Sequence, residues 1–346
     1  MPKDIVIAGG GLAGLTLGLL LRRRGVPVTV MEAGDYPRHR VCGEFISGSG
    51  SEVLNRLELL EEIKKAGGRL AHTAALFAQS GRILEFELPR AAWCISRYRL
   101  DGLLARRFEA AGGVLKKKTR WKDSGSEEGV VRATGRRPAE PLRGAWRWFG
   151  LKVHCRNVPL IADLEMHFRQ NGYVGLCRLS DEEINLCGLF RTRDPIPALA
   201  SEWKEFLTES GPAVFRQKLR DAVYDEASFC AIAALDPGGL PLTSQIEIRI
   251  GDALGMIPPV TGNGMSIAFE TAYAAAGPLV AYAQDILNWQ EAARAVHQNN
   301  SAQLLRRLRY ARVVHPFLFR TALQNIICSN RFMGRWLLRQ LFERTR

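Results

Sequence analysis

The hydrophobic pattern of the chain changes from one region to the next, and each pattern predicts a different element. The N-terminal stretch 4–32 runs from a β-branched strand, Ile5 to Ala8, through a glycine-rich turn into an apolar helix and then a second strand over 26–31. Residues 73–96 alternate apolar and polar side chains, with turns expected at Gly81 and Pro89, which predicts an antiparallel strand pair.

The middle and the end of the chain follow two further patterns. Short strands are predicted at 150–155, 164–169, 172–179 and 183–190. A helix is predicted over 201–222, because Trp203, Phe206, Leu207, Phe215 and Leu219 fall on one face. From residue 285 onward the chain is expected to form several basic helices. The presence of both predicted strands and predicted helices indicates a mixed α/β protein.

Length and composition narrow the class of protein. A chain of 346 residues with 47% apolar and 24% charged residues is typical of a two-lobed globular enzyme. Its seven cysteines form no C-x-x-C pair and its six histidines show no ligand spacing, so neither a disulfide framework nor a metal site is expected. These cysteines favour a reducing, cytoplasmic setting. The apolar run 15–21 is too short to span a bilayer and is expected to be a buried helix.

The charge is uneven along the chain. The net charge is +13, and residues 303–346 hold ten arginines against one acid, Glu343. This region is either a solvated basic helical face or a surface that attracts a membrane or an acidic carrier protein, and both interpretations stay open here. Nucleic acid is not an expected partner, because no recognition motif accompanies the charge.

The glycine-rich turn has the spacing of a dinucleotide-binding site. Gly9 would make the tight turn, Gly11 would let the backbone approach a pyrophosphate, and Gly14, helped by Gly18, would let the helix lie close to the strand. The diphosphate would rest on the helix N-terminus, beside Leu12 and Ala13. Glu32, followed by Ala33, ends the second strand where a carboxylate can bind ribose hydroxyls, which disfavours NADP in this cradle.

A second stretch, residues 248–272, favours FAD over NAD. A short strand leads into Gly251 and Asp252, and an aspartate at a strand end can accept hydrogen bonds from a polyol. After a turn at Pro258-Pro259, the run Gly262-Asn263-Gly264-Met265 opens a helix rich in small residues. The bare N-terminus of such a helix suits the edge of an isoalloxazine that gains negative charge on reduction.

With "RVCGE" at 40–44 and "SRYRLD" at 96–101, these motifs resemble the FAD-dependent superfamily of p-hydroxybenzoate hydroxylase. The resemblance covers most of residues 1–160 and 245–290 and is nearest to the geranylgeranyl reductase-like branch, a neighbour of the flavin-dependent halogenases. It implies a Rossmann-like FAD-binding domain with an inserted antiparallel β-sheet substrate domain and C-terminal helices. The FAD-binding domain would comprise 1–70, 96–140 and 245–288, the substrate domain 71–95 and 141–244, and the basic helical region 289–346.

The resemblance also implies roles for individual residues. Arg40 and Arg97 would contact the diphosphate or the ribityl chain, Asp252 would bind the ribityl chain, and Gly262 to Met265 would lie behind the flavin ring. Gly135, in "ATGR" at 133–136, would close against the cofactor. No second Rossmann motif is present, so NAD(P)H would act as a transient electron donor. Neither the substrate nor the oligomeric state follows from the sequence.

Several reactions remain open for the flavin. Oxygenation of a lipophilic polyketide- or terpenoid-like molecule needs little from side chains beyond placing the substrate and excluding water. Reduction of an isoprenoid C=C bond is the alternative, supported by Cys42 beside Gly43 and Glu44 but weakened at 172–178, where the Trp and Phe-Pro of that branch are missing. Halogenation is disfavoured because Trp146-Arg147-Trp148 lacks the following Ile-Pro, and no iron–sulfur cysteine set supports an electron-transfer protein. The candidate catalytic residues are Cys42, Glu44, Lys152, His154 and Pro258, with Lys152 and His154 facing either the cavity or solvent.

Overall fold

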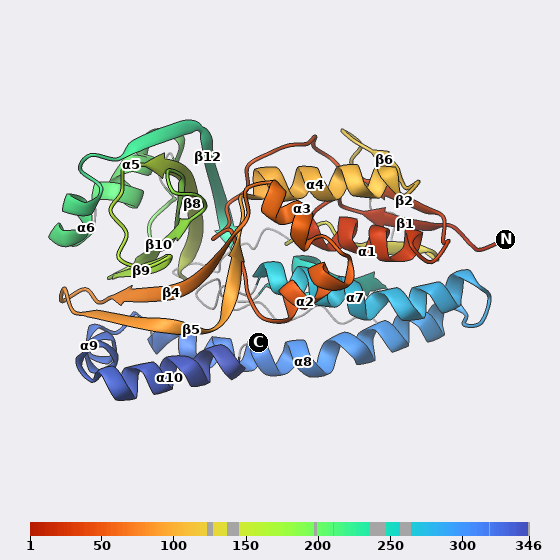
Figure 1. The fold of residues 1–346 in the computed structure, drawn as a ribbon. Helices are drawn as coiled ribbons and strands as arrows, with labels where there is room; N and C mark the ends of the chain where they lie inside the picture. The colour runs from red at the N-terminus through yellow and green to blue at the C-terminus, as the bar shows by residue number, and fades with distance from the viewer. Residues whose placement is uncertain are drawn as a thin grey trace.

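The computed structural model describes residues 1–122, 127–136, 145–196, 199–209, 211–235, 247–256, 264–317 and 319–344. Two β-sheets form two lobes that lie side by side, and a layer of C-terminal helices runs beneath both (Figure 1). The predicted fold class, a Rossmann-like parallel domain with an antiparallel sheet and C-terminal helices, is confirmed.

The first lobe is built on a five-stranded sheet whose pairs are all parallel. Its strand order is β13 (Ile248–Arg249), β7 (Val130–Arg132), β1 (Ile5–Ala8), β2 (Val28–Met31) and β6 (Val114–Lys116). The principal helices of this lobe are α1 (Leu12–Arg22), α4 (Arg97–Ala110) and α7 (Gly264–Ala283). Ten of the eleven residues of α1 are buried, which explains why this helix is apolar on every face.

The second lobe is built on an eight-stranded sheet. Its order is β12 (Val223–Leu235), β8 (Arg147–Arg156), β11 (Ile184–Thr192), β10 (Gly172–Arg178), β9 (Leu164–Arg169), β4 (Arg69–Phe77), β5 (Ile83–Cys94) and β3 (Phe45–Ile46). The four predicted strands between 150 and 190 are confirmed as β8 to β11. The β3 strand joins this sheet although it falls within the range 1–70 assigned to the FAD-binding domain, and the domain boundaries stay a prediction.

Two local expectations are wrong. Pro89 does not make a turn but lies inside β5, where the pairing slips between Ala71↔Ala92 and Thr73↔Glu87. A proline that cannot donate a ladder hydrogen bond is tolerated at such an irregularity. The helix expected over 201–222 is broken into α5 (Leu199–Lys204), a π-helical turn η1 (Glu205–Glu209) and α6 (Ala213–Lys218), with Gly211 and Pro212 at the break.

Further helices lie between these strands or form the lower layer. The helices α2 (Ser49–Arg56) and α3 (Leu60–Lys65) lie between β3 and β4, and the 3₁₀ turn η2 (Gly251–Ala253) lies between β13 and α7. The expected C-terminal helices are confirmed as α8 (Trp289–Phe317), α9 (Thr321–Ser329) and α10 (Arg331–Arg344). Figure 1 shows α8 under both lobes and α10 alongside β5. Among the described residues, no helix combines the length and the apolar character needed to cross a bilayer.

Candidate active site

The three glycines of the first turn each meet a different constraint. Gly9 has φ +110°, and a Cβ there would lie 2.3 Å from the Ala133 carbonyl oxygen. A Cβ on Gly14 would lie 1.9 Å from the Gly9 carbonyl oxygen, so the close approach of α1 to the β1 turn requires glycine. A Cβ on Gly11 would meet nothing within 4 Å, which leaves open space at the N-terminus of α1 for a ligand. Gly18 was expected to help α1 approach the strand, but it faces Phe108 of α4 instead.

Glu32 lies at the end of β2 and holds the turn in place. Its carboxylate accepts hydrogen bonds from the backbone N–H of Gly10 at 2.9 Å and of Gly34 at 2.7 Å, and pairs with Arg38 at 2.7 Å. Burial alone would raise the pKa of Glu32, but the hydrogen bonds from Arg38, Gly34 and Gly10 outweigh burial and lower the pKa to about 2. The carboxylate is therefore ionised at neutral pH, as ribose binding requires.

Arg38 is a residue that the sequence analysis missed in favour of Arg40. Its Nε and Nη2 atoms are buried and have no hydrogen-bond partner among the described residues. A buried guanidinium with unsatisfied donors is costly unless a ligand supplies acceptors. Arg40 is exposed as a residue, and its pKa is lowered by partial desolvation of the guanidinium and by the charges of Arg38 and Arg97. The sequence feature that could have identified Arg38 is its position two residues before Arg40 in the same basic loop.

The turn at Gly251 brings Asp252 to the same edge of the parallel sheet. Gly251 has φ +59°, its N–H donates to Thr271 Oγ1 at 2.9 Å, and a Cβ there would lie 2.9 Å from Ala13 Cβ. Asp252 is exposed, yet burial by the surrounding protein raises its pKa while Arg97 and Arg136 act to lower it. Asp252 therefore lies within the electrostatic range of two arginines at this edge of the sheet.

The residues at this edge fit FAD. The carboxyl ends of β1, β7 and β13 are followed by Gly9, Gly135 and Asp252, and ligands of open α/β sheets bind at such an edge. Bare N–H groups at α1, the unsatisfied Arg38 donors and the Asp252 carboxylate would suit phosphates and a polyol. FAD bound here would supply hydride acceptance from a nicotinamide and reactivity with O₂.

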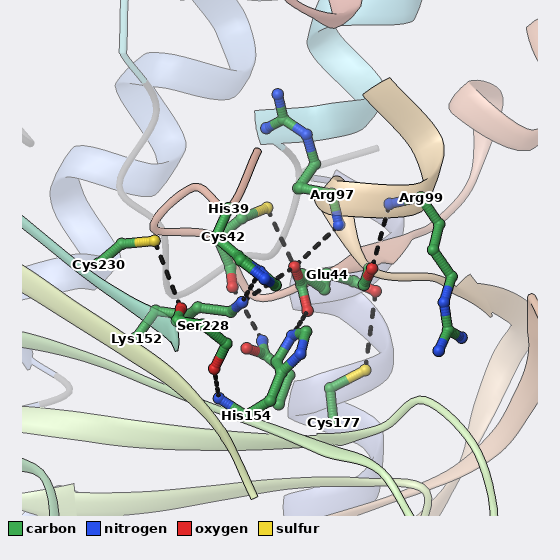
Figure 2. A network of polar contacts seen from close by, with 12 residues as sticks. His39, Cys42, Glu44, Arg97, Arg99, Lys152, His154, Cys177, Ser228 and Cys230 are labelled. Carbon is green, nitrogen blue, oxygen red and sulfur yellow. Dashed lines mark hydrogen bonds and ion pairs between the residues drawn. The ribbon is translucent and has the colours of Figure 1, made fainter. Parts of the chain in front are cut away.

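A cluster of buried polar side chains lies where the two lobes meet (Figure 2). Lys152 and His154 both come from β8 and are 0% and 2% exposed, so the alternative that they face solvent is wrong. His154 Nε2 lies 2.7 Å from Glu44 Oε2, and Lys152 Nζ lies 3.6 Å from Glu44 Oε1 and 3.0 Å from His39 Nδ1. We call His39, Glu44, Lys152, His154, Glu183 and Asn185 the polar cluster.

The cluster continues toward the surface through Glu183. His154 Nδ1 lies 2.9 Å from Glu183 Oε1, and Glu183 Oε2 accepts from Arg99 at 2.9 Å. Burial acts to lower the pKa of His154, but hydrogen bonds to Glu183 and Glu44 raise it above the ordinary value. The hydrogen bond from His154 lowers the pKa of Glu183. His39 behaves in the opposite way, because burial and the charge of Lys152 lower its pKa to about 4. The geometry therefore holds a protonated His154 between two carboxylates.

Asn185 has an unsatisfied buried acceptor in the same place. It is paired with His154 across β8 and β11, and its Nδ2 donates to the Cys42 carbonyl oxygen at 2.9 Å. Its Oδ1 atom is buried and has no hydrogen-bond partner among the described residues. A buried acceptor without a partner indicates that a ligand or a water donates to it.

Arg97 and Cys42 link the polar cluster to the cofactor edge. The Arg97 backbone N–H donates to Glu44 Oε1 at 2.8 Å, while its guanidinium pairs with buried Asp101 at 2.7 and 2.9 Å. Burial raises the pKa of the Cys42 thiol although Arg97 acts to lower it, so the thiol is protonated at neutral pH. The charge of Arg97 also acts to lower the pKa of Asp252, so the same arginine lies near both the cofactor turn and the polar cluster.

The remaining candidate residues are distributed as follows. Leu12 and Ala13 are buried at the start of α1, and Met265 is 5% exposed with its side chain in the core. Ala33 is exposed, Gly135 has φ +76°, and Gly264 begins α7. Pro258, Gly262 and Asn263 lie outside the described residues. His39, Glu183 and Asn185 were missed, because no local motif marks them and they lie near Lys152 only in the folded chain. The roles of all these residues stay predictions.

A family comparison decides the nature of the cofactor. The sequence profile of the family described as FAD binding domain matches residues 3–142. The matched residues include the glycine turn, α1 and Glu32, and the cofactor is FAD. The prediction of FAD from the two glycine motifs is thereby confirmed, and the flavoprotein resembles the superfamily named from its sequence.

Curated relatives match the flavoprotein over short stretches. It is 30% identical over 106 residues to 1H-pyrrole-2-carbonyl-[peptidyl-carrier protein] brominase of Pseudoalteromonas luteoviolacea (strain 2ta16), covering 30% of this chain and 26% of that protein. It is 35% identical over 81 residues to 6-methylpretetramide 4-monooxygenase of Streptomyces rimosus, covering 23% of this chain and 19% of that protein. The matched stretches thus span about a quarter or less of the relatives.

Solved structures match the whole flavoprotein. The flavin-dependent brominase Bmp2 superposes with a TM-score of 0.74 at 16% identity, covering 98% of this chain and 94% of that one. PqsL of Pseudomonas aeruginosa, described as a probable FAD-dependent monooxygenase, superposes with a TM-score of 0.70 at 19% identity, covering 96% and 99%. At these identities the likeness establishes the fold.

Proposed function

We propose that this flavoprotein is an FAD-dependent monooxygenase that uses NAD(P)H and O₂ to hydroxylate or epoxidise a lipophilic polyketide- or terpenoid-like molecule. The observation that carries the proposal is the buried polar cluster, which is joined to the FAD-binding edge through Arg97. Lys152 and His154 are cations held by Glu44 in a site shielded from water. Such cations stabilise a phenolate or enolate, and an electron-rich carbon of that kind is what a flavin oxygenase attacks.

The unsatisfied Asn185 Oδ1 supports the same assignment. An acceptor within the polar cluster can bind a hydroxyl or N–H of the substrate, while Lys152 stabilises the adjacent oxygen as it loses its proton. His39 is neutral at physiological pH, because burial and the charge of Lys152 lower its pKa to about 4, and it accepts a hydrogen bond from Lys152 Nζ at 3.0 Å. His39 would therefore orient the lysine and stay unprotonated during the reaction. The sequence similarity to 6-methylpretetramide 4-monooxygenase and the structural similarity to PqsL support this chemistry.

Two observations favour other reactions. The protonated thiol of Cys42 beside the cofactor edge would suit proton donation to a C=C bond, as the geranylgeranyl reductase-like alternative requires. The 30% identity to a brominase favours halogenation, although Phe149-Gly150-Leu151 follows Trp146-Arg147-Trp148 without the Ile-Pro of the halogenase motif.

One experiment separates the three reactions. FAD-loaded protein is incubated with NADPH, ¹⁸O₂ and potassium bromide against a panel of phenols, β-dicarbonyl polyketides and prenyl alcohols, and products are analysed by mass spectrometry. The proposal expects one labelled oxygen atom in the product and the other in water. A brominated product, or a product with two added hydrogens formed without O₂, would overturn it. Lys152→Met should lower turnover of the substrate found, whereas Lys64→Met, at an exposed lysine on α3, should leave it unchanged.

A further inference from the structure

Helix α10 presents two faces that differ sharply in their surroundings. One face packs onto β5 and α9, where Gly334 and Leu338 are buried. A Cβ on Gly334 would lie 2.1 Å from the Ile327 carbonyl oxygen and 2.8 Å from Leu84 Cδ2, and Arg335 Nε donates to the Glu85 carbonyl oxygen at 3.1 Å. The helix is therefore held against the second lobe by a narrow strip of small and apolar contacts (Figure 1).

The other face exposes large apolar side chains. Phe332 is 85% exposed, Trp336 55%, Met333 38% and Leu337 36%. At about 100° per residue these four positions cover an arc of about 140° on one side of the helix. Ile326 of α9, the neighbouring helix, is also 51% exposed. Among the side chains that the structure describes, most other exposed large apolar residues are spread singly between Met1 and Ile286, so this concentration in six consecutive positions is distinctive. We call Phe332, Met333, Trp336 and Leu337 the apolar arc.

Positive charge accompanies the apolar arc. Arg335 and Arg339 are exposed beside it on the helix, and residues 320–346 contain six arginines against the single Glu343. Aromatic and aliphatic residues on one face with arginines along its border characterise helices that lie in the plane of a lipid interface. The positive charges of the bordering arginines are complementary to the negative charges of anionic lipid headgroups. An acidic protein surface would pair with the arginines but would leave the exposed Phe332 and Trp336 without an apolar partner.

We infer that α10 docks on an anionic lipid surface, with the apolar arc in the headgroup–acyl boundary and the arginines at the headgroups. This inference concerns a surface away from the polar cluster and does not depend on the reaction proposed above. Because α10 lies along β5 of the second sheet, docking would bring that lobe to the lipid phase, from which a lipophilic molecule can enter.

The test measures binding of the full-length, FAD-loaded protein to vesicles by co-sedimentation. Vesicles contain either phosphatidylcholine alone or equal parts phosphatidylcholine and phosphatidylglycerol. We expect binding to the anionic vesicles that weakens at high salt. The double variant Phe332→Ser/Trp336→Ser should bind at least about tenfold more weakly, because two large apolar side chains no longer leave water for the lipid phase.

A matched control changes exposed apolar residues elsewhere. Ile161→Ser/Val223→Ser removes side chains that are 50% and 48% exposed on the second lobe and should bind as the parent protein does. Unchanged FAD content and melting temperature show that each variant is folded. Lipids brominated on the acyl chain should quench Trp336 fluorescence, and the quenched fraction should fall in Trp336→Phe while binding persists.

Several results would overturn the inference. These are no binding to anionic vesicles, equal binding to neutral vesicles, or binding that the double variant leaves unchanged. Loss of self-association in Phe332→Ser/Trp336→Ser would assign the apolar arc to a second copy of the chain. Binding of a purified acidic carrier protein that requires Arg335 and Arg339 but not Phe332 or Trp336 would assign the helix to a protein partner.

Discussion

The open space at Gly11 makes a sharp test of the cofactor site. Gly11 has φ −80° and ψ −171°, a conformation that alanine adopts without strain, and its added Cβ would touch no protein atom within 4 Å. In Gly11→Ala, loss of glycine at the helix N-cap costs roughly 0.5–1 kcal/mol. Reduced freedom of the unfolded chain offsets about 0.4–1 kcal/mol of that cost. The apoprotein should therefore keep its stability within about 1 kcal/mol.

The same methyl group should weaken FAD binding, because it occupies the space into which the diphosphate must come. Crowding of this size costs about 1–3 kcal/mol, which corresponds to an FAD dissociation constant roughly 5- to 150-fold larger. The assay reconstitutes the apoprotein with FAD, follows the quenching of flavin fluorescence, and measures the melting temperature of the apoprotein separately.

Gly14→Ala provides the contrasting variant. Its Cβ would lie 1.9 Å from the Gly9 carbonyl oxygen, so the backbone must move and the apoprotein itself should lose stability. The reasoning is refuted if Gly11→Ala binds FAD as tightly as the parent, or if it destabilises the apoprotein as much as Gly14→Ala does.

Four further predictions concern the cofactor turn and the polar cluster. Asp252→Ala should lower FAD retention on gel filtration, and a fully flavin-loaded variant would contradict the role of this turn. Cys42→Ala should keep most oxygenase turnover with FAD bound, whereas complete loss of turnover would favour C=C reduction. Lys152→Met, which leaves Glu44 bound to His154 and to the Arg97 N–H, should lower kcat at least about tenfold at unchanged FAD content, and a change confined to KM would count against proton handling. By NMR, His39 should stay neutral down to about pH 4, and His154 should stay protonated above pH 6.5. The stability that protonated His154 contributes is complete below pH 6.5 and is lost as the pH rises through its raised pKa. The loss of stability caused by His154→Gln should therefore become smaller at high pH.

Most of the cofactor site of this protein could be predicted from local spacing along the chain. Strand, glycine turn, helix, second strand and terminal carboxylate follow one another within residues 5–32, and each contact among them is local or between adjacent elements. Spacing along the chain is then sufficient to place Gly9, Gly14 and Glu32. The strands between 150 and 190 could also be predicted, because the alternation of apolar and polar residues shows which side chains share a face.

Which residues contact each face of a helix or strand became clear only in the folded structure. Gly18 was expected to approach a strand, but α4 brings Phe108 against it. The apolar face over 201–222 was predicted correctly, whereas Gly211 and Pro212 interrupt the helix that should carry it. Pro89 stays in β5 because the neighbouring strand slips in register at that point.

The polar cluster shows the same limit most clearly. Glu44 and Lys152 are separated by more than a hundred residues, and no local sequence pattern around either residue indicates that they are in contact. Periodicity shows that Lys152 and His154 point to one side of β8, but it cannot show whether water or a carboxylate lies there. Folding places Glu44 on that side, and a lysine that would otherwise be too costly to bury becomes a paired cation within the candidate active site.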